Sequence, residues 1–179
     1  DKEVFEHLPT QSTEMISRFH NAERVAKCDL SIFIWGEQGT GKESLARAIH
    51  RSSLRVNGPF IAVDGAAHRQ DEFSSELFGR AKDWSGKHDE KQGFIEAAKG
   101  GTLFIDNIDR LGLPVQVRLK RVIQNAEYYK DSSTEIIRSN VRIIVSSTRD
   151  LTSSKYRDTF SRDLLYHLMV NSMRIPPLR

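Results

Sequence analysis

The sequence predicts an α/β fold in which helices cover both faces of a parallel sheet. The first observation is a set of five short runs that are mostly apolar and rich in Ile, Val and Phe, which is typical of strands buried on both faces. The second is that segments with helical spacing of apolar residues separate these runs, and such alternation favours an open sheet. The predicted strands span residues 31–35, 60–64, 102–106, 141–147 and 170–175. The predicted helices span residues 42–51, roughly 71–78, 114–126 and roughly 161–168.

The chain ahead of the first strand divides into a linker and a helix. Residues 1–11 are mostly polar with one proline, which favours a linker entering a domain. From Ser12 onward apolar residues recur at helical spacing, and Ser12 or Thr13 is suited to cap the resulting helix. We expect this helix to cover the edge of the sheet near the glycine-rich turn at residues 36–43. Its apolar positions are Met15, Phe19, Ala22 and Ala26.

Two later stretches lack a clear period. Segment 80–92 is charged, so we expect an exposed loop there, whereas segment 127–140 holds either a small hairpin or another loop. Pro114 is expected to begin a helix, because its missing N–H costs nothing in the first turn. The core domain is predicted to span residues 12–175, and residues 176–179 to lead out of it.

Composition narrows the class of protein. A chain of 179 residues fits one domain, and 27 basic against 24 acidic residues give a net charge of +3, which does not indicate nucleic-acid binding. Cys28 is the only cysteine, which excludes an internal disulfide and fits a cytoplasmic protein. No long uncharged apolar run is present, so we expect no membrane span. Because the chain begins at Asp1 without methionine, we expect it to be a piece of a longer protein.

A glycine-rich turn lies between the first predicted strand and the first predicted helix after it. Glycines allow backbone N–H groups to converge on one point, and a helix that begins there aims its positive dipole end at the same point. This arrangement suits a phosphate chain, with Lys42 reaching the outer phosphates. Glu43 stands where a Ser or Thr hydroxyl would usually touch Mg²⁺. The alternative is a turn that binds nothing. The turn consists of Gly36, Glu37, Gln38, Gly39, Thr40, Gly41, Lys42 and Glu43.

A second nucleotide motif ends the strand predicted at residues 102–106. Asp106 closes this apolar run, which would place a carboxylate at the carboxyl edge of the sheet, where it could hold Mg²⁺ directly or through water. The alternative is an acid that caps the next helix. Asn107 follows it, and an amide can orient a water molecule but cannot accept its proton, so we expect weak or absent hydrolysis.

Several segments, taken in order, resemble the AAA+ domain of bacterial enhancer-binding transcription activators, which act on sigma-54 RNA polymerase. The likeness covers nearly the whole chain from about residue 10. The segments are GEQGTGKE (36–43), PFIAVDGAA (59–67), SSELFG (74–79), AAKGGTLFIDNID (97–109), VQVRLKRVIQ (115–124), VRIIVSSTRDL (141–151) and RDLLYHL…RIPPLR (162–179).

The resemblance implies a three-layer P-loop fold whose five-stranded parallel sheet has the order 5-1-4-3-2. It also implies ATP or ADP with Mg²⁺ as the ligand, self-association into a dimer or higher oligomer, and RNA polymerase holoenzyme as a partner. DNA would be bound through a domain outside this chain. The family continues with a small helical lid, which we expect to be largely absent here.

Five positions with roles in the family's hydrolysis carry other residues in this sequence. Asn107 stands in place of the catalytic Glu, Asp64 in place of the Asn that restrains that Glu, and Thr148 in place of a sensing Asn. In the family, two arginines reach a neighbouring subunit's nucleotide, and their positions are occupied here by Ser161 and His167.

Two further features bear on that comparison. Arg162 lies one place after Ser161 and is a candidate for a displaced arginine finger, whereas His167 is either a partial substitute or an ordinary surface histidine. The family's sigma-contacting loop carries Gly-Ala-Phe-Thr-Gly-Ala, which is absent from residues 80–87. Trp84 is the only large apolar residue there, so this segment is either a solvated loop or a new contact.

The sequence therefore predicts a nucleotide-binding regulatory or oligomerisation module of a transcription activator, with degenerate hydrolysis and sigma-contact motifs. An active ATPase motor that remodels sigma-54 polymerase is the alternative. A cyclic di-GMP-responsive module is a further alternative, in which Arg55 and Asn57 could face the dinucleotide, although a polar turn before a strand also explains them. A different P-loop enzyme lacks support, because no Asn-Lys-x-Asp guanine-reading motif is present.

Overall fold

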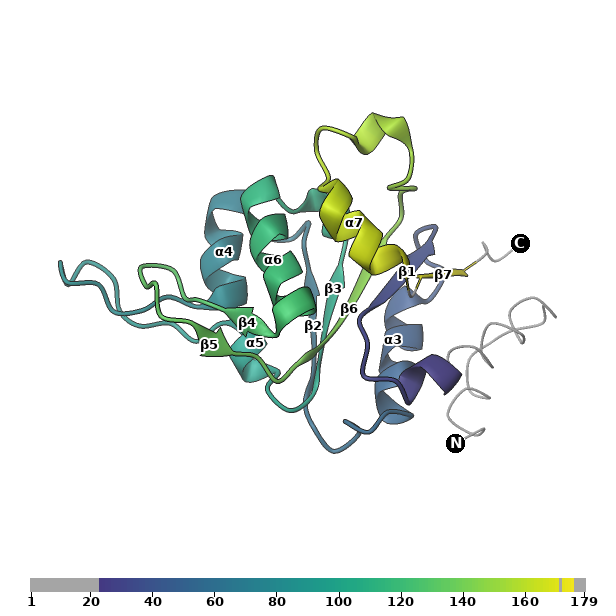
Figure 1. Cartoon of the computed structure of the whole chain (residues 1–179), viewed down its shortest axis with the longest axis horizontal. Helices are drawn as coiled ribbons and strands as arrows, with labels where there is room; N and C mark the ends of the chain where they lie inside the picture. Colours follow the sequence, from purple (N-terminus) through teal and green to yellow (C-terminus); the bar gives the residue numbers. More distant parts are fainter. Residues whose placement is uncertain (1–22, 171, 176–179) are drawn as a thin grey trace.

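The computed structural model describes residues 23–170 and 172–175, which form a helix–sheet–helix arrangement (Figure 1). The main sheet contains β1 (Ile32–Gly36), β2 (Phe60–Asp64), β3 (Thr102–Asp106), β6 (Arg142–Ser147) and β7 (Ser172–Ile175). The helices are α3 (Lys42–Arg51), α4 (Gln70–Phe78), α5 (Phe94–Ala97), α6 (Leu113–Asn125) and α7 (Arg162–Met169), with 3₁₀ turns η1 (Ile108–Arg110) and η2 (Ser154–Tyr156). A small hairpin pairs β4 (Glu127–Tyr128) with β5 (Ile137–Arg138).

All neighbouring strands of the main sheet are parallel. Their order is β2-β3-β6-β1-β7, so β1 lies beside β6 and β7, and β2 lies at the opposite edge. The register aligns Asp64 at the end of β2 with Asp106 at the end of β3. Because the carboxyl ends of parallel strands meet at one edge, these two carboxylates are neighbours there.

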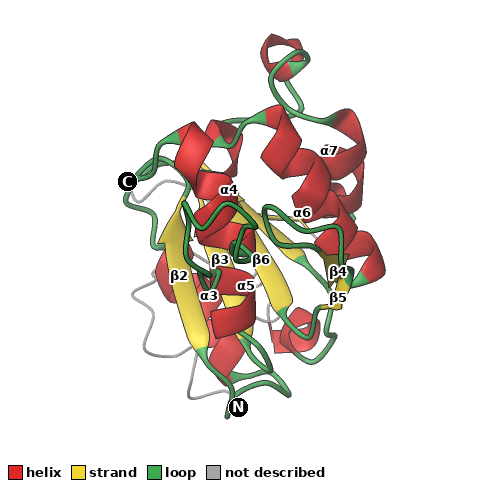
Figure 2. Ribbon diagram, turned by 90° about the vertical axis from the view of Figure 1, so that its left-hand side faces the viewer, coloured by secondary structure: helices red, strands yellow, loops and turns green. Residues whose placement is uncertain are grey.

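Side chains of β1 alternate between the two faces, as the period of two in a strand requires. Ile32 and Ile34 pack against Leu45 and Ile49 of α3, whereas Phe33 faces the cluster on the other side. The sheet therefore separates two apolar clusters. Figure 2 shows the helices that cover them, with α3 behind the sheet and the other long helices in front.

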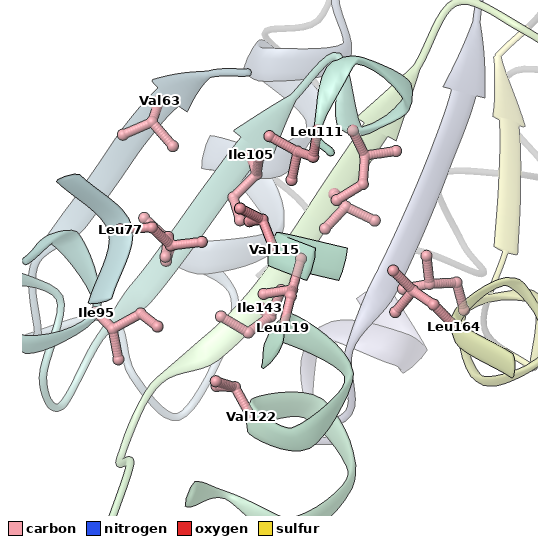
Figure 3. Close-up of a cluster of buried hydrophobic side chains, with 14 of the residues drawn as sticks. Val63, Leu77, Ile95, Ile105, Leu111, Val115, Leu119, Val122, Ile143 and Leu164 are labelled. Atoms are coloured by element: carbon pink, nitrogen blue, oxygen red, sulfur yellow. The ribbon is translucent and has the colours of Figure 1, made fainter. Parts of the chain in front are cut away.

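The larger cluster lies under α4, α6 and α7 (Figure 3). Leu77 of α4, Leu119 of α6 and Leu164 of α7 are fully buried in it. On α6 the buried apolar positions are four or three residues apart, which gives the helix one apolar face toward Ile105 and Ile143 of the strands.

The segment between α4 and α5 extends away from the sheet beside the β4–β5 hairpin (Figure 1). Arg80 and Lys91 exchange two backbone hydrogen bonds at its base, and Ala81 donates to the carbonyl oxygen of Asp131 at 2.9 Å. The side chain of Trp84 near the tip is fully exposed. The base is thus fixed while the tip faces solvent.

The predicted α/β class, parallel sheet and helices on both faces are confirmed. The predicted loop at 80–92 is also observed, and of the two alternatives for 127–140 the hairpin is present. The helix expected from Ser12 lies mostly outside the described residues, within which residues 23–26 are helical. The linker at 1–11 and the exit at 176–179 also lie outside them. No helix within the described part of the chain is long and apolar enough to cross a membrane.

Candidate functional site

The predicted phosphate loop connects β1 to α3 in the expected geometry. Gly39 and Gly41 have φ of 77° and 81°, the left-handed conformation that glycine adopts without steric cost. Gly41 is also the N-cap of α3 and supplies no side-chain cap. The first N–H groups of α3 are therefore directed out of the helix without an internal partner, as at helix starts that bind anions.

Lys42 lies inside the loop with 6% of its surface exposed. Its Nζ donates to the carbonyl oxygens of Gly36 at 3.0 Å and Glu37 at 2.8 Å. Burial lowers the pKa of this ammonium, and the charge of nearby Asp106 opposes that shift. A buried cation held by two neutral carbonyls is well placed to receive an anion, whose negative charge would compensate its desolvation.

A polar cleft of about 550 Å³ opens between the loop and the carboxyl edge of β2, β3 and β6. Eight of the predicted site residues line it: Gln38, Gly39, Gly41, Lys42, Glu43, Asp106, Asn107 and Thr148. The other three residues of the loop stabilise it through hydrogen bonds. The carbonyl oxygens of Gly36 and Glu37 accept from Lys42, and the hydroxyl of Thr40 donates to the carbonyl oxygen of Glu37 at 2.7 Å.

Asp106 is held as an acceptor at the end of β3. Its Oδ1 accepts from the hydroxyl of Ser146 at 2.5 Å and from the backbone N–H of Asn107 at 2.9 Å. No group of three His, Cys, Asp or Glu side chains able to hold a metal occurs within residues 23–170. One carboxylate at a phosphate cleft nevertheless fits Mg²⁺, which usually keeps several waters and takes other ligands from substrate phosphates.

Asn107 links β3 to β2 through its side chain. Its amide Nδ2 donates to Oδ1 of Asp64 at 2.8 Å, and the same oxygen accepts from the backbone N–H of Ala66 at 2.9 Å. Asn107 adopts a left-handed backbone conformation, with φ 53° and ψ 49°, which Asn tolerates better than most residues with a side chain. Asp64, Ala66 and Asn107 all line the cleft.

Two arginines in the cleft were not anticipated as site residues. Arg110 and Arg149 both line it, and both approach the buried carboxylate of Asp109, with N–O distances of 3.9 and 3.5 Å. Ser147 also donates to Asp109 at 2.9 Å. The acid-rich stretch 106–109 was visible in the sequence, but the pairing of Asp109 with residues after β6 depends on the sheet order.

The residues near α7 lie apart from the cleft. Ser161 caps this helix by accepting from the N–H of Leu164, Arg162 is exposed at its first position, and the ring of His167 stacks edge-on against Tyr166. None of the three is part of the cleft lining. Any role for Arg162 or His167 as a finger would therefore be toward another subunit.

Arg55, the candidate for cyclic di-GMP, is already engaged. Its guanidinium makes two hydrogen bonds to the carboxylate of Asp29, at 2.6 and 2.7 Å, and a third to the carbonyl oxygen of Asn140 at 3.2 Å. The hydrogen bond to Asp29 raises the pKa of Arg55. Most N–H donors of this guanidinium are therefore already engaged and are not available to a phosphate.

The phosphate loop, the strand that ends in Asp106 and the parallel sheet are features that this chain shares with a known family. The Sigma-54 interaction domain matches residues 8–174 of the chain. The chain belongs to this family. The DNA-binding transcriptional regulator NtrC of Rhizobium meliloti is 42% identical over 173 residues, covering 96% of this chain and 36% of the relative. The transcriptional regulatory protein GlrR of Escherichia coli is 41% identical over 179 residues, covering 99% of this chain and 40% of the relative. The chain thus spans well under half the length of these relatives.

The fold is likewise similar to solved structures. NtrX from Brucella abortus in complex with ADP superimposes with a TM-score of 0.87 at 33% identity, covering 99% of this chain and 38% of the other. The same protein in complex with ATP also has a TM-score of 0.87 at 33% identity, with coverage of 96% and 37%. This Sigma-54 interaction domain therefore has the P-loop α/β fold of its family.

Proposed function

We propose that this domain binds ATP or ADP and acts as a regulatory and oligomerisation module of a bacterial transcription activator. One observation carries the proposal: the open amides of α3, the buried ammonium of Lys42 and the carboxylate of Asp106 converge on one polar cleft. Helix-start amides and a lysine complement a phosphate chain. The ADP and ATP complexes of the related NtrX support the same ligand class.

Asp106 is the residue that would hold Mg²⁺, because it lines the cleft with one oxygen fixed by Ser146 and Asn107. When bound, Mg²⁺ would neutralise part of the charge on the outer phosphates. The domain itself supplies Lys42 and the loop amides to the phosphate chain, and Thr148, directly after β6, as a neutral contact in place of a sensing amide.

We further propose that hydrolysis is weak and that the sigma-contact motif has degenerated. The amide of Asn107 follows Asp106 at the point where a carboxylate would activate water, and it cannot accept a proton. The expected output of nucleotide binding is then self-association, with DNA bound through a domain outside this chain and RNA polymerase holoenzyme as the partner. Arg162 on the exposed start of α7 is the candidate to reach a neighbouring subunit.

An active motor that remodels sigma-54 polymerase is the second candidate. The fully exposed Trp84, on a loop whose base is fixed by Arg80 and Lys91, is the feature that favours it, because an exposed aromatic tip is suited to contact a partner. A cyclic di-GMP-responsive module is less favoured, since Arg55 is occupied by Asp29.

Calorimetric titration of the domain with Mg-ATP, Mg-ADP and cyclic di-GMP tests the ligand. We expect ATP and ADP to bind and Lys42→Ala to weaken ATP binding at least about tenfold, which corresponds to about 1.4 kcal/mol. Lys99→Ala makes the same chemical change on the exposed surface between α5 and β3 and should bind as the parent does. Absence of ATP binding by the parent protein would refute the proposal.

Phosphate release at saturating ATP, measured with the same proteins, tests the rate. We expect turnover well below about 1 s⁻¹, the lower end of ordinary enzyme rates. Turnover at or above that value, with stimulation on mixing with sigma-54 polymerase, would instead support the motor.

A further inference from the structure

Three carboxylates line the nucleotide cleft within the described residues, and they are engaged differently: Glu43, Asp64 and Asp106. Glu43 lies in the first turn of α3, where its Oε1 pairs with Arg47 at 2.9 Å on the exposed helix surface. Asp106 is the carboxylate suited to the metal. Asp64 is therefore the remaining acid that could take a proton inside the cleft.

The two oxygens of Asp64 are not equivalent. Oδ1 accepts both the amide of Asn107 and the N–H of Ala66, which fixes the carboxylate in one orientation. Oδ2 accepts no hydrogen bond from any of the residues that the structure describes, although Asp64 lines the cleft. A carboxylate with one oxygen anchored and the other available has the arrangement required of a general base.

The position of Asp64 also suits that role. It ends β2 in register with Asp106, which ends β3, and adjacent strands lie about 4.8 Å apart. Both acids therefore lie one strand apart, and both line the cleft. A water molecule in the cleft beside β2 could donate a hydrogen bond to Oδ2 of Asp64.

We infer that Asp64, oriented by Asn107, is the catalytic base for the slow hydrolysis of ATP by this domain. The inference rests on the proposed nucleotide site and goes beyond it by naming the proton acceptor. The water oxygen forms a bond to the γ-phosphorus while one water proton passes to Oδ2 of Asp64. The bond from the γ-phosphorus to the bridging oxygen breaks, and its electron pair stays on the terminal phosphate of ADP. The products are ADP and inorganic phosphate, and the proton then leaves Asp64 for solvent.

The pairing explains why an amide at 107 need not abolish turnover. One carboxylate and one amide face each other across β2 and β3, and the carboxylate belongs to β2. Asn107→Glu alone would bring a second negative charge against Asp64, and like charges at hydrogen-bond distance oppose each other's ionisation. The matching exchange is therefore the double variant Asp64→Asn with Asn107→Glu, which keeps one acid and one amide.

Single-turnover hydrolysis of ATP, together with calorimetric binding, tests the inference. We expect Asp64→Asn to lower the rate at least about 10²-fold, the range for loss of a general base, while its Kd for Mg-ATP changes less than about threefold. The double exchange should recover at least about tenfold of that loss. Asp71→Asn, the same change on an exposed residue of α4, should retain the parental rate.

Lys42→Ala sets the background for any contaminating ATPase. Parental turnover no higher than this background, or an Asp64→Asn rate equal to the parental rate, would overturn the inference while leaving nucleotide binding intact. A parallel loss of ATP binding in Asp64→Asn, with an unchanged melting temperature, would also overturn it, because Asp64 would then be a binding residue. Failure of the parent protein to bind ATP would refute the proposed function itself.

Discussion

His50, near the end of α3, shows how a single buried side chain makes stability depend on pH. Its Nδ1 lies 2.8 Å from the hydroxyl of Thr102, and its ring packs against Phe60 with the centroids 5.4 Å apart. Burial lowers its pKa, and the positive charges of Arg142 and Arg51 lower it further, whereas a backbone hydrogen bond with Gly58 opposes the shift. The folded state therefore holds this imidazole neutral.

Acidification should for this reason destabilise the fold. Above the unfolded pKa of 6.5 both states carry a neutral His50, so it contributes no pH dependence. As the pH falls below 6.5, the unfolded state binds a proton that the folded state resists. The free energy of unfolding should then fall by up to about 1.4 kcal/mol per pH unit until the lowered folded pKa is reached.

The measurement is urea unfolding between pH 5 and pH 7 for the parent protein and for His50→Asn, whose amide can still pair with Thr102. We expect the free energy of unfolding to depend less steeply on pH in the variant, by up to the equivalent of one proton taken up on unfolding. An equal slope in both proteins would show that His50 does not cause the dependence.

At the scale of elements, Arg118 of α6 joins the helix to the base of the exposed loop. Its guanidinium lies 4.0 Å from the ring centroid of Phe78 and 4.3 Å from that of Tyr129. It donates to Ser74 and Asp131, both at 2.6 Å, and also to the carbonyl oxygen of Tyr129. The backbone of Asp131 in turn pairs with Gly79 and Ala81 at the loop base.

Arg118→Ala should therefore lower the free energy of unfolding by about 2–3 kcal/mol, because it removes charged hydrogen bonds and two aromatic contacts together. Arg118→Lys should recover only part of this, since an ammonium cannot reproduce the planar fork. Arg138→Ala is the matched control, because Arg138 is largely exposed and forms a surface ion pair with Glu127 at 3.6 Å. A loss below about 0.5 kcal/mol in Arg118→Ala would contradict the role we assign to it.

The elements that the sequence predicted well are those long enough to show a period. The ranges 42–51, 60–64 and 102–106 coincide with α3, β2 and β3. The short helix α5 and the 3₁₀ turns were not anticipated, because three or four residues are too few to reveal a helical repeat. The strands of the hairpin have only two residues each, which are too few to show an alternating pattern, so the sequence does not distinguish a hairpin from a loop at residues 127–140.

At the scale of the whole molecule, Arg142 connects the start of the described chain to the centre of the sheet. It is 1% exposed, and it donates to the carbonyl oxygens of Leu30 at 3.0 Å and of Ala26 and Val25, both at 2.8 Å. Burial lowers its pKa. One side chain thus donates to three carbonyls at the end of the helical turn 23–26 and the following segment, more than 100 residues away in the chain.

Arg142→Met should keep much of the apolar packing yet remove the donor to the carbonyl oxygens of Leu30 and Ala26, at a cost of about 3 kcal/mol or more, whereas the carbonyl of Val25 still accepts from the N–H of Cys28 at 3.1 Å. Arg157→Met, at an exposed position after η2, should change stability by less than about 0.5 kcal/mol. Urea unfolding measures both, and equal midpoints for the two variants would argue against the connection.

The sequence predicts those parts of the site that are formed by residues close together in the chain. It does not by itself predict contacts between residues far apart in the chain. The sequence predicts Lys42 and Asp106 as site residues because strand and turn flank them directly in the chain. The contact of Asp109 with Arg149 joins residues about 40 positions apart, and it becomes visible only when β3 and β6 are placed side by side. The family resemblance already pairs positions 64 and 107, and the structure shows the contact between Asp64 and Asn107. What the sequence does not reveal is the direction of this contact, in which the amide of Asn107, directly after β3, donates to the carboxylate of Asp64 on β2.

The two tryptophans stand in opposite surroundings. Trp84 is surrounded by solvent, whereas Trp35 is partly buried on β1 immediately ahead of Gly36 and the phosphate loop. Indole emission shifts to longer wavelength in water and responds to nearby charge. The domain therefore carries two intrinsic fluorophores in different surroundings, one near the loop tip and the other beside the start of the phosphate loop, and both can be followed without an attached label.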